Sequence, residues 1–258
     1  MTAYLLGTRR RAMLWWTVAI AAVAAMYTAF YPVIGGMQIE GMLESFPDAV
    51  LVALGWDAFT SGAGYVNATV FSLVGAVLTL TCGIGAGARL IAGEEERGLL
   101  ELELAAPVSR GAVYWHRIAT LWVFLLGPAG GVLLVVGVLD PVLSLEIPVG
   151  HLVAATVALW LFAGAIGTVT YAIGAITGRR AHALAAGSGL AVASYLLAYL
   201  GPLAELDWMT NLSPYWWYVG DRPLLNGADW VGMAALVVLG ALAATAGIAG
   251  FVRRDTNV

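Results

Sequence analysis

Long apolar runs alternate with short polar segments along the whole chain. Six of these runs reach about 20 residues, the length that an α-helix needs to cross a hydrocarbon core about 30 Å thick. The pattern therefore predicts an all-α, polytopic membrane protein with six transmembrane helices, organised as one transmembrane domain over residues 1–258. The predicted spans cover about residues 12–34, 66–91, 118–139, 152–177, 183–200 and 230–252.

Composition also places the chain outside the range of soluble globular proteins, since 61% of its residues are hydrophobic and 11% are charged. The sequence contains no lysine. Without a lysine the chain cannot form a Walker A loop or a Schiff base with retinal or pyridoxal phosphate, so any ATP hydrolysis must come from another polypeptide. The one cysteine, Cys82, falls inside the second predicted span and has no partner for a disulfide within the chain.

The arginines predict the orientation, because basic residues that flank membrane spans stay on the cytoplasmic side. They gather before the first span, between the second and third, between the fourth and fifth, and after the sixth. Only Arg222 falls on the other side. Both termini are therefore expected in the cytoplasm, which requires an even number of crossings.

Glycines recur at four-residue intervals in three places, a spacing that lets helix backbones approach closely. The pairs are Gly83 and Gly87, Gly127 and Gly131, and Gly174 and Gly178. Together they favour tightly packed helices over a wide pore.

Two polar segments on the outer side are longer than simple turns. In residues 35–65, apolar positions recur at helical spacing between acidic ones, which predicts amphipathic helices on the outer membrane surface. Residues 201–229 are rich in Trp and Tyr, which indicates an aromatic belt at the membrane interface. An outer gate for substrate release is the alternative for this second segment.

Charge concentrates in one inner segment between the second and third spans, where residues 93–117 read GEEERGLLELELAAPVSRGAVYWHR. The positive-inside rule explains its arginines but not its five glutamates. The leucines of residues 99–104 predict a short helix along the inner surface, with Pro107 just past its end. Ser109 is placed to cap a second helix that continues from Arg110 into the third span. We expect a soluble partner to bind this loop.

The spans contain hydroxyl and amide groups but no acidic or basic side chain near the middle of the membrane. Because an intramembrane charge is costly, carriers that couple transport to protons or sodium usually keep one for function. The three histidines, His116, His151 and His182, do not group with a nucleophile or with other metal ligands. The sequence thus predicts no catalytic residue and no metal site, and transport is expected to be driven from outside this chain.

The charged loop resembles the signature region of ABC-2 type permeases, the membrane subunits of bacterial and archaeal ABC exporters. In that family the pattern G-E-E-x-x-G-T-L-E-x-L-L-x-x-P-V-S-R lies between spans two and three. This chain matches the pattern at Gly93, Glu94, Glu95, Gly98, Leu100, Glu101, Leu104, Pro107, Val108, Ser109 and Arg110. It departs at Leu99, where Thr is usual, and at Glu103, where an apolar residue is usual. The number of spans and the position of the termini agree with the family as well.

The resemblance implies a permease subunit of an ATP-driven exporter, multi-pass in the plasma (inner) membrane. It would bind two separate ABC ATPase (nucleotide-binding) subunits and pair with a second permease copy, identical or a paralogue. ATP and Mg would bind to the ATPases, so no cofactor on this chain and no nucleic-acid partner are expected. The segment from Gly93 to Arg110 would couple the ATPases to the spans, with the largest contributions from Glu94, Glu95, Glu101 and Arg110.

An apolar path through the spans suits a hydrophobic or amphipathic compound. Aromatic residues of spans one, two and five are the predicted wall of this path, namely Trp16, Tyr27, Phe30, Phe71, Tyr195 and Tyr199. The alternative for these side chains is contact with lipid or with neighbouring helices. The alternatives for the whole chain are a membrane scaffold or assembly protein that recruits a cytosolic partner, and a stand-alone secondary carrier.

Overall fold

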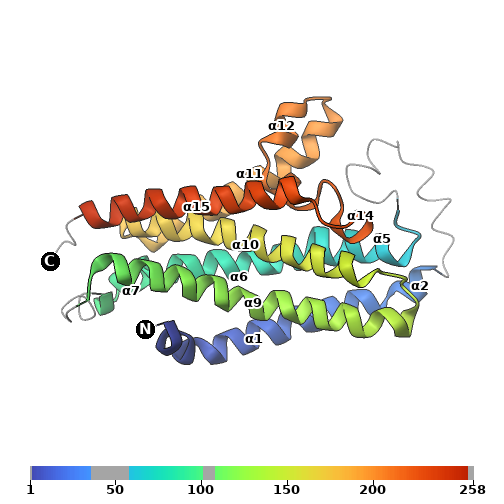
Figure 1. Cartoon of the computed structure of the whole chain (residues 1–258), viewed down its shortest axis with the longest axis horizontal. Helices are drawn as coiled ribbons and strands as arrows, with labels where there is room; N and C mark the ends of the chain where they lie inside the picture. Colours follow the sequence, from blue (N-terminus) through green and yellow to red (C-terminus); the bar gives the residue numbers. More distant parts are fainter. Residues whose placement is uncertain (1, 36–57, 101–107, 255–258) are drawn as a thin grey trace.

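The computed structural model describes residues 2–35, 58–100 and 108–254 (Figure 1). Within these residues the chain is helical and has no strand, which confirms the predicted fold class. Six helices are long and apolar enough to cross a membrane. They cover Arg9–Val33, Gly62–Leu90, Arg110–Leu143, Val149–Thr177, Arg180–Leu203 and Trp230–Arg253. The predicted outer helices over 39–54 and most of the predicted inner helix over 99–104 lie outside the described residues.

The long helices are α1 (Thr2–Ala29), α6 (Gly75–Leu90), α9 (Arg110–Leu143), α10 (Val149–Thr177), α11 (Arg180–Leu203) and α15 (Trp230–Arg253). The short elements are α2 (Tyr31–Gly35), α5 (Gly62–Val66), the π-helix η1 (Asn67–Val74), α7 (Ala92–Glu95), α12 (Asp207–Asn211), α13 (Pro214–Val219) and α14 (Pro223–Asn226). Because α5, η1 and α6 follow one another without a gap, they form the second span together.

The long helices lie side by side, and both termini are at the same end of the bundle (Figure 1). The short helix α7 lies at this end too, whereas α2, α5 and α14 lie at the opposite end. We call the end with the two termini and α7 the arginine end, because the arginines of α1, α6, α9 and α15 fall on the turns nearest to it. The opposite end is called the far end.

The central helix is α10, which packs against α6, α9, α11 and α15. Its sequence accounts for this position, since Ala, Gly and Thr occupy many of its buried sites and allow neighbouring helices to approach. By contrast α1 lies at the edge and packs mainly against α9. It leaves Leu14, Trp15 and Val18 exposed, and such apolar side chains are stable when lipid surrounds them.

The glycine spacing predicted close helix contacts. The structure confirms that both glycines of two of the three pairs lie at such contacts. On α6, a methyl group at Gly83 would lie 2.8 Å from the carbonyl oxygen of Ala163, and one at Gly87 would lie 2.4 Å from that of Gly167. On α9, Gly127 and Gly131 both lie against Thr17 of α1.

In the third pair, Gly174 and Gly178, the second glycine ends a helix instead of lying between two packed helices. Gly178 ends α10 with φ +66°, a left-handed conformation that glycine adopts without strain.

The helix that contains the third span begins at Arg110, where the sequence predicted it, and so starts eight residues before the apolar run predicted from residue 118. The predicted cap is confirmed, since the Ser109 hydroxyl oxygen accepts a hydrogen bond of 3.2 Å from the backbone N–H of Ala112. From this cap one helix of 34 residues continues to Leu143. Its first two turns contain Arg110, His116 and Arg117, so the apolar run alone does not include them.

At the far end, the π-helix η1 is held by two tyrosines from the short helix α13. The Tyr218 hydroxyl donates a hydrogen bond of 2.8 Å to the carbonyl oxygen of Phe71, and the Tyr215 hydroxyl donates one to the carbonyl of Ser72. The helix α13 is itself fixed to α11, because the Ser194 hydroxyl accepts from the backbone N–H of Tyr215 at 2.7 Å. Part of the aromatic segment 201–229 is therefore structural rather than a belt at the interface.

Replacement of Tyr218 by Phe should lower the stability of the protein by about 1 kcal/mol, because one buried hydrogen bond to the π-helix is lost. Burial raises the pKa of the Tyr218 phenol well above its ordinary value of about 10. The folded state therefore favours the neutral phenol, and this contribution to stability is complete below about pH 10 and declines as the pH rises further. Thermal unfolding from pH 7 to 11 should show a decline above about pH 10 that is smaller in Tyr218→Phe. Tyr199→Phe is the control, and equal curves for the two variants would contradict the assignment.

Candidate functional site at the arginine end

The segment that matches the predicted coupling motif starts with a break in the second span. The helix α6 ends at Leu90, Ile91 turns the backbone to φ −120°, and the single turn α7 follows. Gly98, which the motif includes, adopts φ +68° and reverses the chain where a side chain would be strained. This local geometry directs three consecutive carboxylates, Glu94 to Glu96, toward the ends of the long helices.

We call Glu94, Glu95 and Glu96 the glutamate triplet. Its first member, Glu94, binds two arginines at once. One carboxylate oxygen lies 2.5 Å from the guanidinium of Arg9 on α1, and the other lies 2.6 Å from that of Arg117 on α9. The Arg117 side chain has 0% exposure and also donates to the carbonyl oxygen of Leu90. Glu94 therefore joins α1, α7 and α9 at a buried charge.

The other two members of the triplet reach different helices. Glu95 forms an ion pair with Arg254, the residue that follows α15. The Glu96 carboxylate accepts a hydrogen bond of 2.7 Å from the backbone N–H of Arg180, the first residue of α11. A carboxylate at the start of a helix is favourable because it meets unpaired N–H groups and the positive end of the helix dipole. The triplet thus connects the loop to four long helices.

Arg110, at the other end of the motif, belongs to the same network. Its guanidinium donates a hydrogen bond of 2.7 Å to the backbone carbonyl oxygen of Arg254, whose side chain pairs with Glu95. The two ends of the motif are therefore brought together next to the end of α15. Gly93 and Leu100 are described as well, and the Leu100 side chain is buried. The remaining motif residues Glu101, Leu104 and Pro107 lie outside the described residues.

Sequence reasoning assigned Glu94, Glu95 and Arg110 to a partner protein, and the structure shows that each also has a partner within the chain. The signal for this was present, since every arginine that sets the orientation sits at the same end as the glutamates. The prediction that the loop binds an ATPase remains a prediction, while its anchoring to the bundle is observed.

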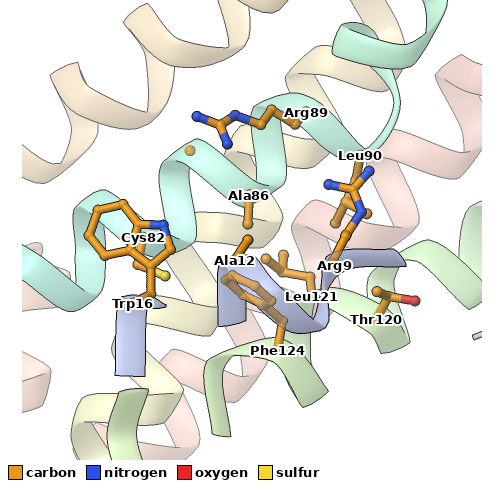
Figure 2. A pocket seen from close by; sticks show the side chains of 11 residues that line it. Arg9, Ala12, Trp16, Cys82, Ala86, Arg89, Leu90, Thr120, Leu121 and Phe124 are labelled. Atoms are coloured by element: carbon orange, nitrogen blue, oxygen red, sulfur yellow. The ribbon is translucent and has the colours of Figure 1, made fainter. Parts of the chain in front are cut away.

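A cavity lies between α1, α6 and α9 at the arginine end (Figure 2). It contains about 470 Å³ of atom-free space, partly open to the surroundings. Arg9 and Arg89 lie toward one side of it, and Trp16, Cys82 and Phe124 line the other. It is the place in the described structure where a predicted path residue, Trp16, faces open space.

The other predicted path residues do not line this cavity. Phe30 is exposed where α1 ends, and the carbonyl oxygen of Tyr27 accepts a hydrogen bond from the Tyr65 hydroxyl. Phe71 is buried in the core of the bundle on η1. The rings of Tyr195 and Tyr199 stack on α11 with centroids 6.3 Å apart. The six side chains thus lie on three separate spans, and a common wall formed by them remains a prediction.

The arrangement joins the loop to the long helices through ion pairs and hydrogen bonds. Among the described residues no group of three His, Cys, Asp or Glu side chains could hold a metal ion. The carboxylates of Glu94 and Glu95 are paired with guanidinium groups, and no nucleophile lies in these pairs.

The sequence matches the family model described as "Multidrug efflux system permease Rv1217c, C-terminal domain" over residues 3–252. This range begins before the first span and reaches the last turn of the sixth. No curated protein and no solved structure matches the chain significantly. Because the match covers nearly the whole chain and agrees with its six spans, this protein belongs to the family of the C-terminal domain of the multidrug efflux system permease Rv1217c.

Proposed function

We propose that this chain is the ABC-2 type permease subunit of an ATP-driven exporter, and that it exports a hydrophobic or amphipathic compound. Two separate ATPase subunits bind it, and they carry the ATP and Mg. A second permease subunit, identical or a paralogue, completes the path. The observation that supports this most is the family match together with a charged loop that matches the coupling motif from Gly93 to Arg110.

An external energy source is favoured by the charges of the spans. In the described helices the charged side chains fall near the ends of the spans, and none lies near the middle. A carrier driven by protons or sodium usually needs such a group. Since the chain also has no lysine for a Walker A loop, the proposed ATPase is a different polypeptide.

The proposed orientation places the arginine end in the cytoplasm, together with both termini. The arginines at this end support it through the positive-inside rule, and both termini lie there in the structure. The ATPases would then approach α7 and the loop that follows it.

The way in which the loop is held favours a role in coupling. One side of the loop is attached to α1, α9 and α11 through Glu94 and Glu96, and the other continues into α9 at Arg110. Since α9 contains no proline between Arg110 and Pro128, a displacement at its start is carried over the first half of the helix, about 27 Å. ATP-driven movement of a protein bound to the loop would therefore shift the populations of the span arrangements.

The test is affinity purification of the protein from its native membrane, followed by mass spectrometry and an ATPase assay. Wild-type protein should recover an ATPase with a Walker A sequence whose activity depends on this chain. Glu101→Arg should reduce the recovered ATPase at least about tenfold, because a reversed charge in a desolvated interface is repelled. Glu146→Arg, at an exposed acid of the far end, is the matched control. A pure wild-type protein without an ATPase would instead favour a scaffold or a stand-alone carrier.

A further inference from the structure

The cavity between α1, α6 and α9 is amphipathic, and the proposed export function does not explain this. Its polar and apolar residues are separated along the helix axis. On α1, Arg9 is seven residues before Trp16, and on α6, Arg89 is seven residues after Cys82. Seven residues correspond to about 10 Å of helix. The cavity therefore changes from cationic to apolar over roughly the depth at which lipid headgroups meet acyl chains.

The cationic side of the cavity has an excess of positive charge. Glu94 is the carboxylate that pairs with Arg9, and Arg9 shares it with the buried Arg117. Arg89 adds a further positive charge and has no hydrogen-bond or ion-pair partner within 2–35, 58–100 and 108–254. Among the residues that the structure describes, none of the side chains that line the cavity is acidic. An anion is therefore the complementary ligand.

The apolar side and the size of the cavity restrict this anion further. Trp16, Leu121 and Phe124 provide an apolar wall next to the arginines (Figure 2). The centre of a water molecule can reach only about 50 Å³ of the cavity, so a slender group fits and a bulky ring compound does not. Gly85 also faces this space, and a methyl group built on it meets no atom within 4 Å.

We propose that this cavity binds an anionic phospholipid, with its phosphate between Arg9 and Arg89 and the start of one acyl chain against Trp16 and Phe124. A guanidinium group presents paired N–H donors that match a phosphate, and basic pockets between membrane helices bind acidic lipid headgroups. The cavity lies beside the edge helix α1, whose exposed Leu14, Trp15 and Val18 would face the bilayer that supplies the lipid. This proposal does not depend on the ATPase or on the direction of transport.

The experiment is native mass spectrometry of the purified full chain, mixed with phosphatidylglycerol or phosphatidylcholine at equal concentration. Wild-type protein should retain phosphatidylglycerol with at least about tenfold preference, and Arg89→Glu should abolish that preference. Arg253→Glu is the matched control, because Arg253 is an exposed arginine in the last turn of α15 and does not line the cavity. Equal losses in the two variants would overturn the proposal, since the effect would then come from the basic end as a whole.

A second variant tests the cavity itself without a change of charge. Gly85→Leu should fill the open space beside α6 and reduce phosphatidylglycerol retention by a similar factor while the chain stays folded. Unchanged retention in a folded Gly85→Leu protein would contradict an acyl chain in the cavity. Dodecyl phosphate and inorganic phosphate serve as further probes. Tight binding of either one without retention of phosphatidylglycerol would show a soluble anion site and would also overturn the lipid assignment.

Discussion

Glu94→Gln is expected to destabilise the protein more than the same change at either of the other two members of the glutamate triplet. The neutral amide leaves Arg117 charged, fully buried and without its carboxylate, and it releases Arg9 as well. Loss of one partner from a buried ion pair typically costs about 3–5 kcal/mol, because the remaining charge is still desolvated. We therefore expect a decrease of about 10 °C in the midpoint of thermal unfolding.

Cys82 provides a reporter for this measurement, since it is the only cysteine and is buried on α6. A thiol-reactive fluorophore should label it only as the bundle opens. Glu96→Gln is the control, because its exposed carboxylate meets a backbone N–H rather than a buried guanidinium. Glu94→Gln combined with Arg117→Met should recover part of the loss, since the guanidinium charge at position 117 is then no longer buried. Equal midpoints for Glu94→Gln and Glu96→Gln would show that the ion pairs carry little of the stability.

The sequence was sufficient for the fold class and for the number of spans, because each span is a long apolar run with few alternatives. Span ends were harder to predict where polar residues continue a helix. Arg110 to Arg117 are charged or polar at several positions, yet the cap at Ser109 and the partners of Arg110 and Arg117 keep them helical. A membrane-length rule does not include these contacts and starts the third span near residue 118, whereas the cap at Ser109 correctly predicted the helix from Arg110.

The sequence predicted which segment carries the candidate site, but it did not predict the ion pairs that connect this segment to the long helices. The motif from Gly93 to Arg110 could be read directly from residue order, whereas the pairing of Glu94 with Arg9 joins residues 85 positions apart. Nothing in local spacing distinguishes Arg9 from Arg10 or Arg11 as the partner. The same applies to Tyr215 and Tyr218, whose sequence suggests an interfacial belt, while the fold directs their hydroxyl groups to the carbonyl groups of η1.

Gly87→Val is expected to prevent normal packing of α6 on α10, the contact around which the bundle is organised. Already the first carbon of the side chain would lie 2.4 Å from the carbonyl oxygen of Gly167, and 3.3 Å from its carbon. Since these are backbone atoms of the central helix, the clash is relieved only when the two helices separate. Overpacking of this kind costs about 1–3 kcal/mol and more where the backbone is the obstacle.

The same substitution two residues earlier is the matched control for this prediction. A side chain at Gly85 enters open space, and Val has a slightly better helix propensity than Gly, so Gly85→Val should be neutral or mildly stabilising. Size-exclusion chromatography after heating should show Gly87→Val aggregating at a clearly lower temperature than wild type, with Gly85→Val unchanged. If both variants aggregate at the same temperature, the effect comes from replacing a glycine in α6 and not from the contact between Gly87 and Gly167. A loss at Gly87 alone would show that close approach of the α6 and α10 backbones holds the second span, and therefore the loop that follows it, in place.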